Sequence, residues 1–266
     1  MRILFIGDVF GRPGRRTVSL LVPGIVESHD IDLVVANAEN LAGGIGMTEK
    51  TGRELLDAGV DVLTGGNHTW KKGDTTTFLS TCERALRPAN YPPGAPGRGA
   101  VTVEARGGER ATVVSLQGRV FMQAIDCPFR VGSRLVDEAR HETPIVLVDF
   151  HAEATAEKVA LGWYLSGRAT AVLGTHTHVQ TSDERILEGH TAYITDVGMT
   201  GPVDSVIGVR RDSSIARFVT QLPQRFEPAD GPTALHGVVV EADAATGAAR
   251  SIERIAVFGG DGGGTP

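Results

Sequence analysis

Short apolar runs alternate with segments of helical spacing along the first quarter of the chain. The runs are continuous rather than alternating, which is typical of strands buried on both faces. We expect these strands at residues 3–6, 33–36 and 60–63. Helices are expected at residues 13–28 and 48–58, with Thr48 as the N-cap of the second and Gly59 just past its end. Strands that alternate with helices in this way predict a largely parallel sheet.

The middle and the last third of the chain have a different pattern. Residues 87–99 are rich in Pro and Gly and predict a loop, and Arg106-Gly107-Gly108 separates two short apolar runs as in a hairpin. The earlier rhythm then resumes, with helices expected at 126–140 and 155–165 and strands at 145–148 and 171–173. The last third is predicted to be mostly β, with strands at 234–240 and 252–257.

The chain contains no internal repeat and no segment with the composition of a linker. A chain of 266 residues suits one large domain or two small ones. We expect residues 1–258 to form a single α/β domain, with a second sheet added to the first. The glycine-rich residues 259–266 are expected to form a flexible tail.

Charge and cysteine content narrow the classes of function. The formal net charge of −6 argues against a broad grip on DNA or RNA, because such binding places Lys and Arg against phosphates. A small phosphorylated ligand stays compatible, since bound cations add positive charge that a sequence count omits. The two cysteines, Cys82 and Cys127, form no zinc-binding pattern and are expected to be reduced and buried. The N-terminal apolar run is too short for a signal peptide or a membrane span, so we expect a cytoplasmic protein that does not enter the membrane.

Residues that can bind metal follow five of the expected strands. In open α/β sheets, ligands bind outside the carboxyl ends of the strands. Each of these residues alone has an ordinary role as a turn, capping or core residue, but their recurrence at five strand ends favours a metal site. In an extended segment, residues two apart point the same way, so His176 and His178 are expected to face one site. The candidates are Asp8, Glu39, Asn40, Asn67, His151, His176 and His178.

The number of donors predicts two metal ions. A catalytic zinc takes three protein ligands and a water molecule, whereas six side chains gather here and Asn40 is a further candidate. Glu39 can bridge two ions through its two carboxylate oxygens, and two ions about 3.5–4 Å apart can clamp a phosphoryl group. Imidazole, carboxylate and amide donors without a thiolate suit iron, manganese or zinc rather than calcium.

The motifs resemble two nested protein families. Gly7-Asp8, Gly66-Asn67-His68, His151 and the segment 174–178 resemble the signature of the calcineurin-like metallophosphoesterase superfamily. A closer resemblance, to the YmdB-type bacterial phosphodiesterases, rests on the segments Gly7-Asp8-Val9-Phe10-Gly11-Arg12-Pro13-Gly14, Ala38-Glu39-Asn40 and Asp196-Val197-Gly198-Met199-Thr200-Gly201-Pro202. It extends over nearly the whole chain.

The resemblance carries specific expectations. It implies a four-layer α/β/β/α sandwich, a di-iron or di-manganese centre, and hydrolysis of small phosphodiesters such as 2′,3′- or 3′,5′-cyclic nucleotides. By resemblance, one metal would be held by Asp8, Glu39, Asn40 and His178. The other would be held by Glu39, Asn67, His151 and His176, with His68 beside the cluster as a residue that binds no metal.

Three positions depart from the wider superfamily. The usual Asp-x-His of the first motif is Asp8-Val9-Phe10 here, and Asn40 is expected to replace the missing imidazole as a weaker ligand. The bridging residue is Glu39 where Asp is usual. Gly66 stands where protein phosphatases of this class carry an arginine, which counts against a phosphoprotein substrate.

The expected reaction is attack of a metal-bridging hydroxide on phosphorus, with His68 as the general acid that protonates the leaving oxygen. An alternative role for His68 is to orient a metal ligand. Alternative functions are a phosphomonoesterase such as a nucleotidase, and a regulatory protein that uses the metal site as a binding scaffold. Association into a homo-oligomer is a generic expectation only.

Other segments near the expected site are less specific. Aromatic residues make up 5% of the chain, too few for an extended stacking platform, although one or two bases could stack on Phe10 or Trp70. Residues 118–129 could form a lid over the substrate or a packed connection. Residues 197–208 hold three glycines and could bring backbone N–H groups to the phosphate. The roles of both segments stay open.

Overall fold

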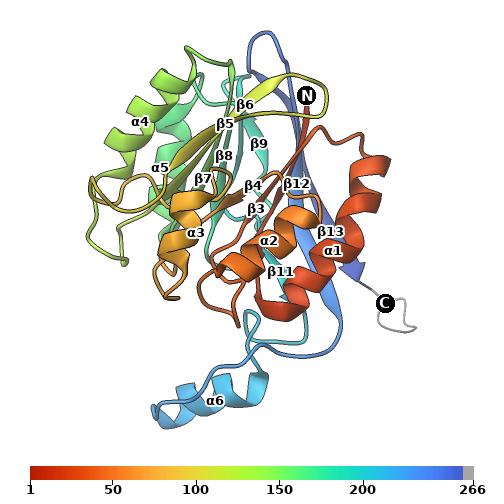
Figure 1. Ribbon diagram of the computed structural model, residues 1–266, viewed down its shortest axis with the longest axis vertical. Helices are drawn as coiled ribbons and strands as arrows, with labels where there is room; N and C mark the ends of the chain where they lie inside the picture. Colours follow the sequence, from red (N-terminus) through yellow and green to blue (C-terminus); the bar gives the residue numbers. More distant parts are fainter. Residues whose placement is uncertain (260–266) are drawn as a thin grey trace.

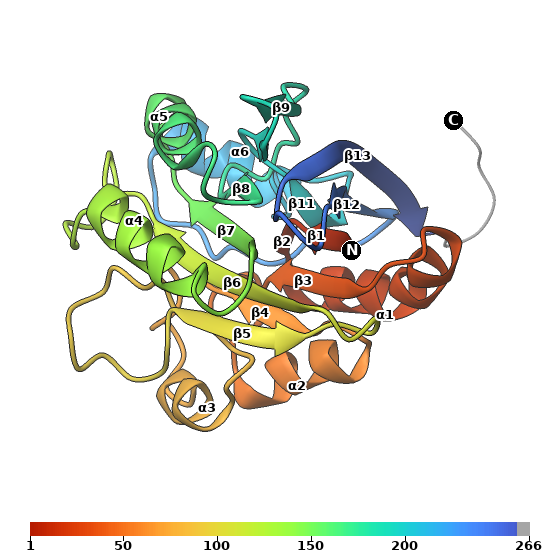
Figure 2. The same ribbon diagram turned by 90° about the horizontal axis from the view of Figure 1, so that it is seen from above.

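The computed structural model describes residues 1–259 as two sheets packed face to face with helices on both outer sides (Figure 1). Seen from above, the molecule has four layers in the order helices, sheet, sheet, helices (Figure 2). The predicted four-layer α/β/β/α sandwich is therefore confirmed.

The first sheet has seven strands in the order β2-β11-β12-β1-β3-β4, and β13 pairs with the free side of β12. The expected parallel strands form its centre, where Ile3 lies beside Leu33 and Val35 beside Val62. The long β12–β13 hairpin confirms the expected β structure at residues 234–257. The bounds are β1 (Arg2–Ile6), β2 (Asp8–Val9), β3 (Leu33–Asn37), β4 (Val62–Thr64), β11 (Met199–Pro202), β12 (Thr233–Ala242) and β13 (Ala249–Gly259).

The second sheet has six strands in the order β5-β6-β7-β8-β10-β9. Its central strands are parallel, and the antiparallel β5–β6 pair confirms the expected hairpin around Arg106-Gly107-Gly108. The bounds are β5 (Ala100–Glu104), β6 (Arg110–Gln117), β7 (Ile145–His151), β8 (Ala171–Thr175), β9 (Arg185–Leu187) and β10 (Thr191–Ile194).

Three apolar cores separate the four layers. Phe5 and Leu147 belong to the core between the two sheets. On one outer side, Val18 and Leu55 are packed in the core beneath α1 (Gly11–Ser28), α2 (Glu49–Asp57) and α3 (Thr75–Thr81). On the other side, Leu161 lies in the core beneath α4 (Pro128–Ala139) and α5 (Thr155–Leu165). Both faces of the parallel strands are thus buried, which explains their unalternated apolar runs.

Two helices were not expected from the sequence. Helix α3 contains three consecutive threonines, whose β-branched side chains disfavour helix; Phe78 holds it against the core. Helix α6 (Arg211–Thr220) interrupts a last third that is otherwise mostly β, as predicted. It projects from the body (Figure 1) and leaves Phe218 and Val219 exposed.

Smaller expectations have mixed outcomes. Thr48 is the N-cap of α2 and forms a capping box with Thr51, and Gly59 follows the helix with φ +98°. Gly259 ends β13 instead of beginning a tail, because its strand pairs with β12. The remaining tail, residues 260–266, lies outside the described residues. Cys82 and Cys127 are free and only half-buried. None of the helices in residues 1–259 is long and apolar enough to cross a membrane.

Candidate metal centre

All seven expected residues meet where the carboxyl ends of both sheets converge. Asn40, however, turns its amide nitrogen to the cluster and its Oδ1, the atom that would bind a metal, to His68. The sequence reasoning placed the seven residues at a single sheet edge; the structure instead takes them from two sheets. Asp8 lies in β2, which is a separate short strand beyond β1, and His151 ends β7. The others follow directly after β3, β4 and β8: Glu39, Asn40, Asn67, His176 and His178.

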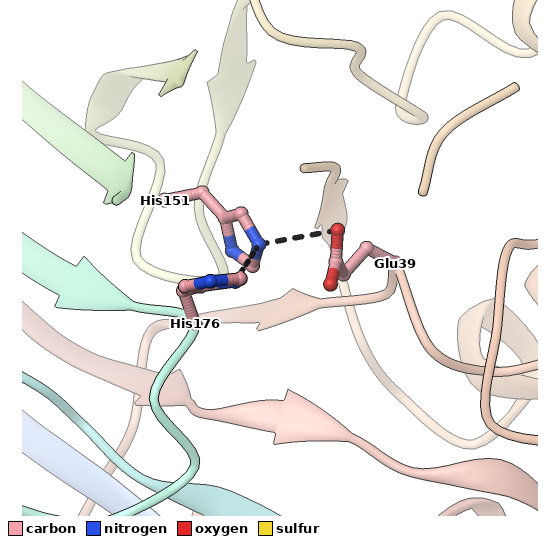
Figure 3. A group of neighbouring side chains, drawn as sticks. All are labelled: Glu39, His151 and His176. Atoms are coloured by element: carbon pink, nitrogen blue, oxygen red, sulfur yellow. Dashed lines mark hydrogen bonds and ion pairs between the residues drawn. The ribbon is translucent and has the colours of Figure 1, made fainter. Parts of the chain in front are cut away.

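One group of donors surrounds the Nε2 atom of His151 (Figure 3). This nitrogen lies 3.2 Å from Glu39 Oε2, 3.0 Å from Asn67 Oδ1 and 3.1 Å from His176 Nδ1. Bonds of about 2.0–2.2 Å to one metal ion would place neighbouring ligand atoms roughly 3.0–3.5 Å apart. The separations therefore fit one coordination shell, and one atom each from Glu39, His151 and His176 lie within 4.8 Å of one another.

A second group lies on the other side of Glu39. Asn40 Nδ2 is 3.1 Å from Glu39 Oε1 and 3.1 Å from His178 Nε2, which in turn lies 3.7 Å from Asp8 Oδ1. That Asp8 oxygen is buried and has no hydrogen-bond partner within residues 1–259. A buried carboxylate oxygen without a partner is costly, and a cation is the natural partner for it.

The hydrogen bonds of the three histidines leave one nitrogen of each directed at the cluster. His151 Nδ1 lies 2.9 Å from Thr175 Oγ1, His176 Nε2 lies 2.9 Å from Glu153 Oε2, and His178 Nδ1 lies 2.9 Å from the carbonyl oxygen of Ile207. When these rings are neutral, the contacts favour a proton on the outward nitrogen and leave the lone pair of the inward nitrogen for a metal ion. Metal-binding histidines are oriented by contacts of this kind.

The negative charge of the carboxylates in the cluster favours a proton on His151. Burial alone lowers the pKa of His151, but the carboxylates of Glu39, Asp8 and Asp149 outweigh it and raise this pKa to about 9. His176 behaves in the opposite way, since burial and the charged His151 lower its pKa to about 4. For Glu39, burial acts to raise the pKa, yet the neighbouring His151 and His68 hold it well below its usual range.

The turn that carries His176 and His178 is not the extended segment that the sequence suggested. β8 ends at Thr175, and both histidines have positive φ, 105° and 66°. Such a backbone is strained for non-glycine residues and persists only where the surroundings hold it. Here Asp8 Oδ2 accepts the His176 N–H at 3.0 Å and Asp196 Oδ2 accepts the Thr177 N–H at 3.0 Å.

His68 lies at the edge of the cluster and is partly exposed. Its Nδ1 is 2.9 Å from Asn40 Oδ1 and 3.1 Å from Glu39 Oε1, so both neighbours are acceptors for a proton on Nδ1. The hydrogen bonds of His68 within residues 1–259 use Nδ1 and the backbone, which leaves Nε2 for a ligand.

Several residues that support the histidines of the cluster were not predicted from the sequence. Asp149 accepts hydrogen bonds from Thr64, Asn37 and Thr175, and so supports the hydroxyl that orients His151. Asp149 stands two residues before His151 in the same strand, a spacing that places both on one face and could have revealed it. Glu153, the partner of His176, has no comparable signal.

Hydrogen bonds constrain parts of the two undecided segments. The amides of Arg119 and Val120 donate to the Glu157 carboxylate, which ties residues 118–129 to α5. The N–H groups of Gly198 and Gly208 donate to Asp196 Oδ1 and Ser205 Oγ. These two glycine amides are therefore not available to a phosphate.

Comparisons with known proteins show which family the chain resembles. The chain is 51% identical over 257 residues to the 2′,3′-cyclic-nucleotide 2′-phosphodiesterase of Bacillus subtilis, covering 97% of each chain. It is 36% identical over 267 residues to a putative phosphatase/phosphodiesterase of Mycoplasma genitalium, covering 97% of this chain and 93% of that one.

Two solved structures share the whole fold. A hypothetical protein from Thermus thermophilus superposes with a TM-score of 0.91 at 45% identity, covering 97% of this chain and 99% of that one. A novel phosphatase from Mycoplasma pneumoniae superposes with a TM-score of 0.89 at 33% identity, covering 97% of this chain and 93% of that one. The family model described as YmdB-like protein matches residues 4–255. The chain therefore belongs to the YmdB-like family.

Proposed function

We propose that this protein is a dinuclear metal-dependent phosphodiesterase that hydrolyses nucleoside 2′,3′-cyclic phosphates. Support comes from the Bacillus subtilis relative, whose name states that activity. The single observation that carries the proposal is the orientation of His151, His176 and His178. Each uses one ring nitrogen to contact a protein oxygen and turns the other toward the same acidic cluster.

The donor set fits two ions of iron or manganese, with zinc as a further candidate. Glu39 Oε2 lies with Asn67, His151 and His176, whereas Glu39 Oε1 lies with Asn40 in the group that contains Asp8 and His178. One carboxylate thus serves both groups. Metal ions held here would supply hydroxide at neutral pH and neutralise charge on the phosphoryl oxygens.

The protein's own residues then orient the ester and move a proton. Water oxygen bonds to phosphorus, the bond from phosphorus to O2′ breaks, and O2′ takes a proton. We assign that proton to His68 Nε2, because Nδ1 is held by Asn40 Oδ1 at 2.9 Å and Nε2 is left for the substrate. The product is a nucleoside 3′-phosphate.

A diester is favoured over a monoester by the surroundings of the cluster. A cavity opens beside it, and the residues of the described chain that line this cavity include no Lys or Arg. Apart from the metals and a protonated His68, no lining residue of the described chain compensates the second negative charge of a phosphate monoester.

Metal analysis of the purified protein, followed by assays on a panel of 2′,3′- and 3′,5′-cyclic nucleotides, tests the proposal. We expect close to two metal ions per chain and turnover of the 2′,3′ esters, and chelation should abolish it. Parallel assays with bis-p-nitrophenyl phosphate and p-nitrophenyl phosphate separate diesterase from monoesterase activity. Turnover that survives complete removal of metal would contradict the proposal.

A further inference from the structure

The cavity beside the metal cluster has one polar and one apolar side. Its volume of about 450 Å³ lies in the range of small-molecule binding sites. Glu39, Asn40, His68, His176 and His178 line the polar side. The apolar side is formed by Phe10, Ile45, Ile207, Val209 and Phe226.

Three of the apolar residues that line the cavity are exposed to solvent. The exposed fractions are 37% for Ile45, 52% for Ile207 and 52% for Phe226. Phe10 behaves differently, because it is buried and its ring packs closely against Gly44 and Gly208. With 5% of its surface exposed, Phe10 presents little ring area to a ligand, so the expectation that Phe10 stacks on a base is not supported. Trp70 does not line the cavity.

Backbone hydrogen bonds join the two chain segments that carry Ile207 and Phe226. Ile207 and Phe226 lie on the two arms of the chain that lead to and from α6. Arg210 N–H donates to Glu227 O at 3.0 Å, and Ala229 N–H donates to Gly208 O at 2.9 Å. The Ile207 carbonyl also accepts the bond from His178 Nδ1. The arm that carries Phe226 is thereby fixed to the arm that contacts a metal-binding residue.

We propose that Phe226, with Ile45 and Ile207, forms a subsite for the nucleobase of the substrate. The inference rests on the proposed function, since the phosphoryl group has to lie at the metal cluster. From there the ribose spans the cavity, and the base covers the apolar wall and stacks on the Phe226 ring. A second phosphate is a poor occupant, because Glu227 lines this end and no Lys or Arg does so within residues 1–259.

The test compares a substrate that has a base with one that lacks it. The substrates are adenosine 2′,3′-cyclic phosphate and 1-O-methylribose 2′,3′-cyclic phosphate. Loss of base stacking on an aromatic ring lowers affinity on the order of 5- to 100-fold. We expect F226A to lower kcat/KM for the adenosine ester by that factor, mainly through KM, and to leave the base-free ester within about twofold. F226W should retain the wild-type values.

F218A is the matched control. Phe218 lies in α6, between the two arms of the chain, and is 73% exposed. It does not line the cavity. It should leave both substrates unchanged. Titration calorimetry with adenosine 3′-phosphate, the product, should show the same weakening in F226A and none in F218A.

The outcomes separate the two proposals. Equal wild-type efficiency on both esters, or equal loss on both in F226A, would overturn the base subsite and leave the phosphodiesterase intact. If the wild type cleaves neither ester, the proposed function fails. The calorimetric comparison then still decides the subsite, because unchanged product binding in F226A would overturn it.

Discussion

The ammonium group of Lys158 lies 2.7 Å from the Asp196 carboxylate, and both side chains are fully buried. Asp196 also accepts the backbone N–H groups of Thr177 and Gly198. The ion pair therefore lies directly behind the strained turn that presents His176 and His178, and it connects α5 to the segment between β10 and β11.

Removal of the Lys158 charge should destabilise the protein and the turn together. K158M leaves a buried carboxylate without its counterion, which costs about 3–5 kcal/mol. We expect urea denaturation of the metal-free protein to show a loss of this size, and the variant to bind less metal. R134M is the control, because the Arg134–Glu138 pair is on the surface and contributes little. A K158M variant as stable as R134M would contradict this role.

Gly66 leaves room for the cluster, and a methyl group there should disrupt it. A Cβ atom at this position would overlap with Glu39 Oε2 and would lie 2.6 Å from His151 Nε2. We expect G66A to lower metal affinity on the order of 10- to 100-fold, since displaced ligands bind less well. G73A is the control, because no atom of residues 1–259 lies within 4 Å of its added Cβ. Metal analysis after dialysis against a weak chelator compares them; equal metal content would refute the steric argument.

The positions of the donors could be predicted because they depend on local pattern. Short apolar strands alternate with helices, and the residue after each strand is placed at the carboxyl edge by that topology alone. Asp8, Glu39 and His151 follow from this rule. The closure of the cluster by a second sheet does not follow from it, because no local pattern states which strand ends lie opposite each other.

What the sequence could not provide depends on contacts between distant segments. The bond from His178 to the Ile207 carbonyl joins residues that are 29 positions apart. The turn in which His176 and His178 have positive φ is held by hydrogen bonds from His176 N–H to Asp8 and from Thr177 N–H to Asp196. Helix α6, in contrast, could have been predicted from local pattern, because its apolar residues have helical spacing.

Metal binding should release a proton from His151. In the metal-free protein the pKa of His151 is raised to about 9 from its ordinary value of 6.5. The imidazolium therefore stabilises the metal-free fold fully below about pH 6.5, and this contribution is lost as the pH rises through about 9. At neutral pH an incoming ion has to displace that proton, whereas His176, with a pKa of about 4, has none to lose.

Calorimetric titration of metal into the metal-free protein, in two buffers with different ionisation enthalpies, measures this release. We expect about one proton for the ion that binds His151 at pH 7, and almost none at about pH 10, where His151 is already neutral. A heat of binding that does not depend on the buffer at pH 7 would show that His151 is not protonated in the metal-free state.

His68 should affect the rate without affecting the metals. Its ring contacts Glu39 and Asn40 through Nδ1, its backbone N–H donates to Glu39 Oε2, and its ring is not among the donors around His151 Nε2. We expect H68A to keep its metal content and to lose on the order of 10²–10⁴ in kcat on a 2′,3′-cyclic nucleotide, whose alkoxide leaving group needs a proton. With bis-p-nitrophenyl phosphate the loss should be small, because p-nitrophenolate leaves without one. E39Q is the contrasting variant, since it should lower metal content and both activities together. Equal losses on both substrates in H68A would assign His68 a positioning role instead of that of a general acid.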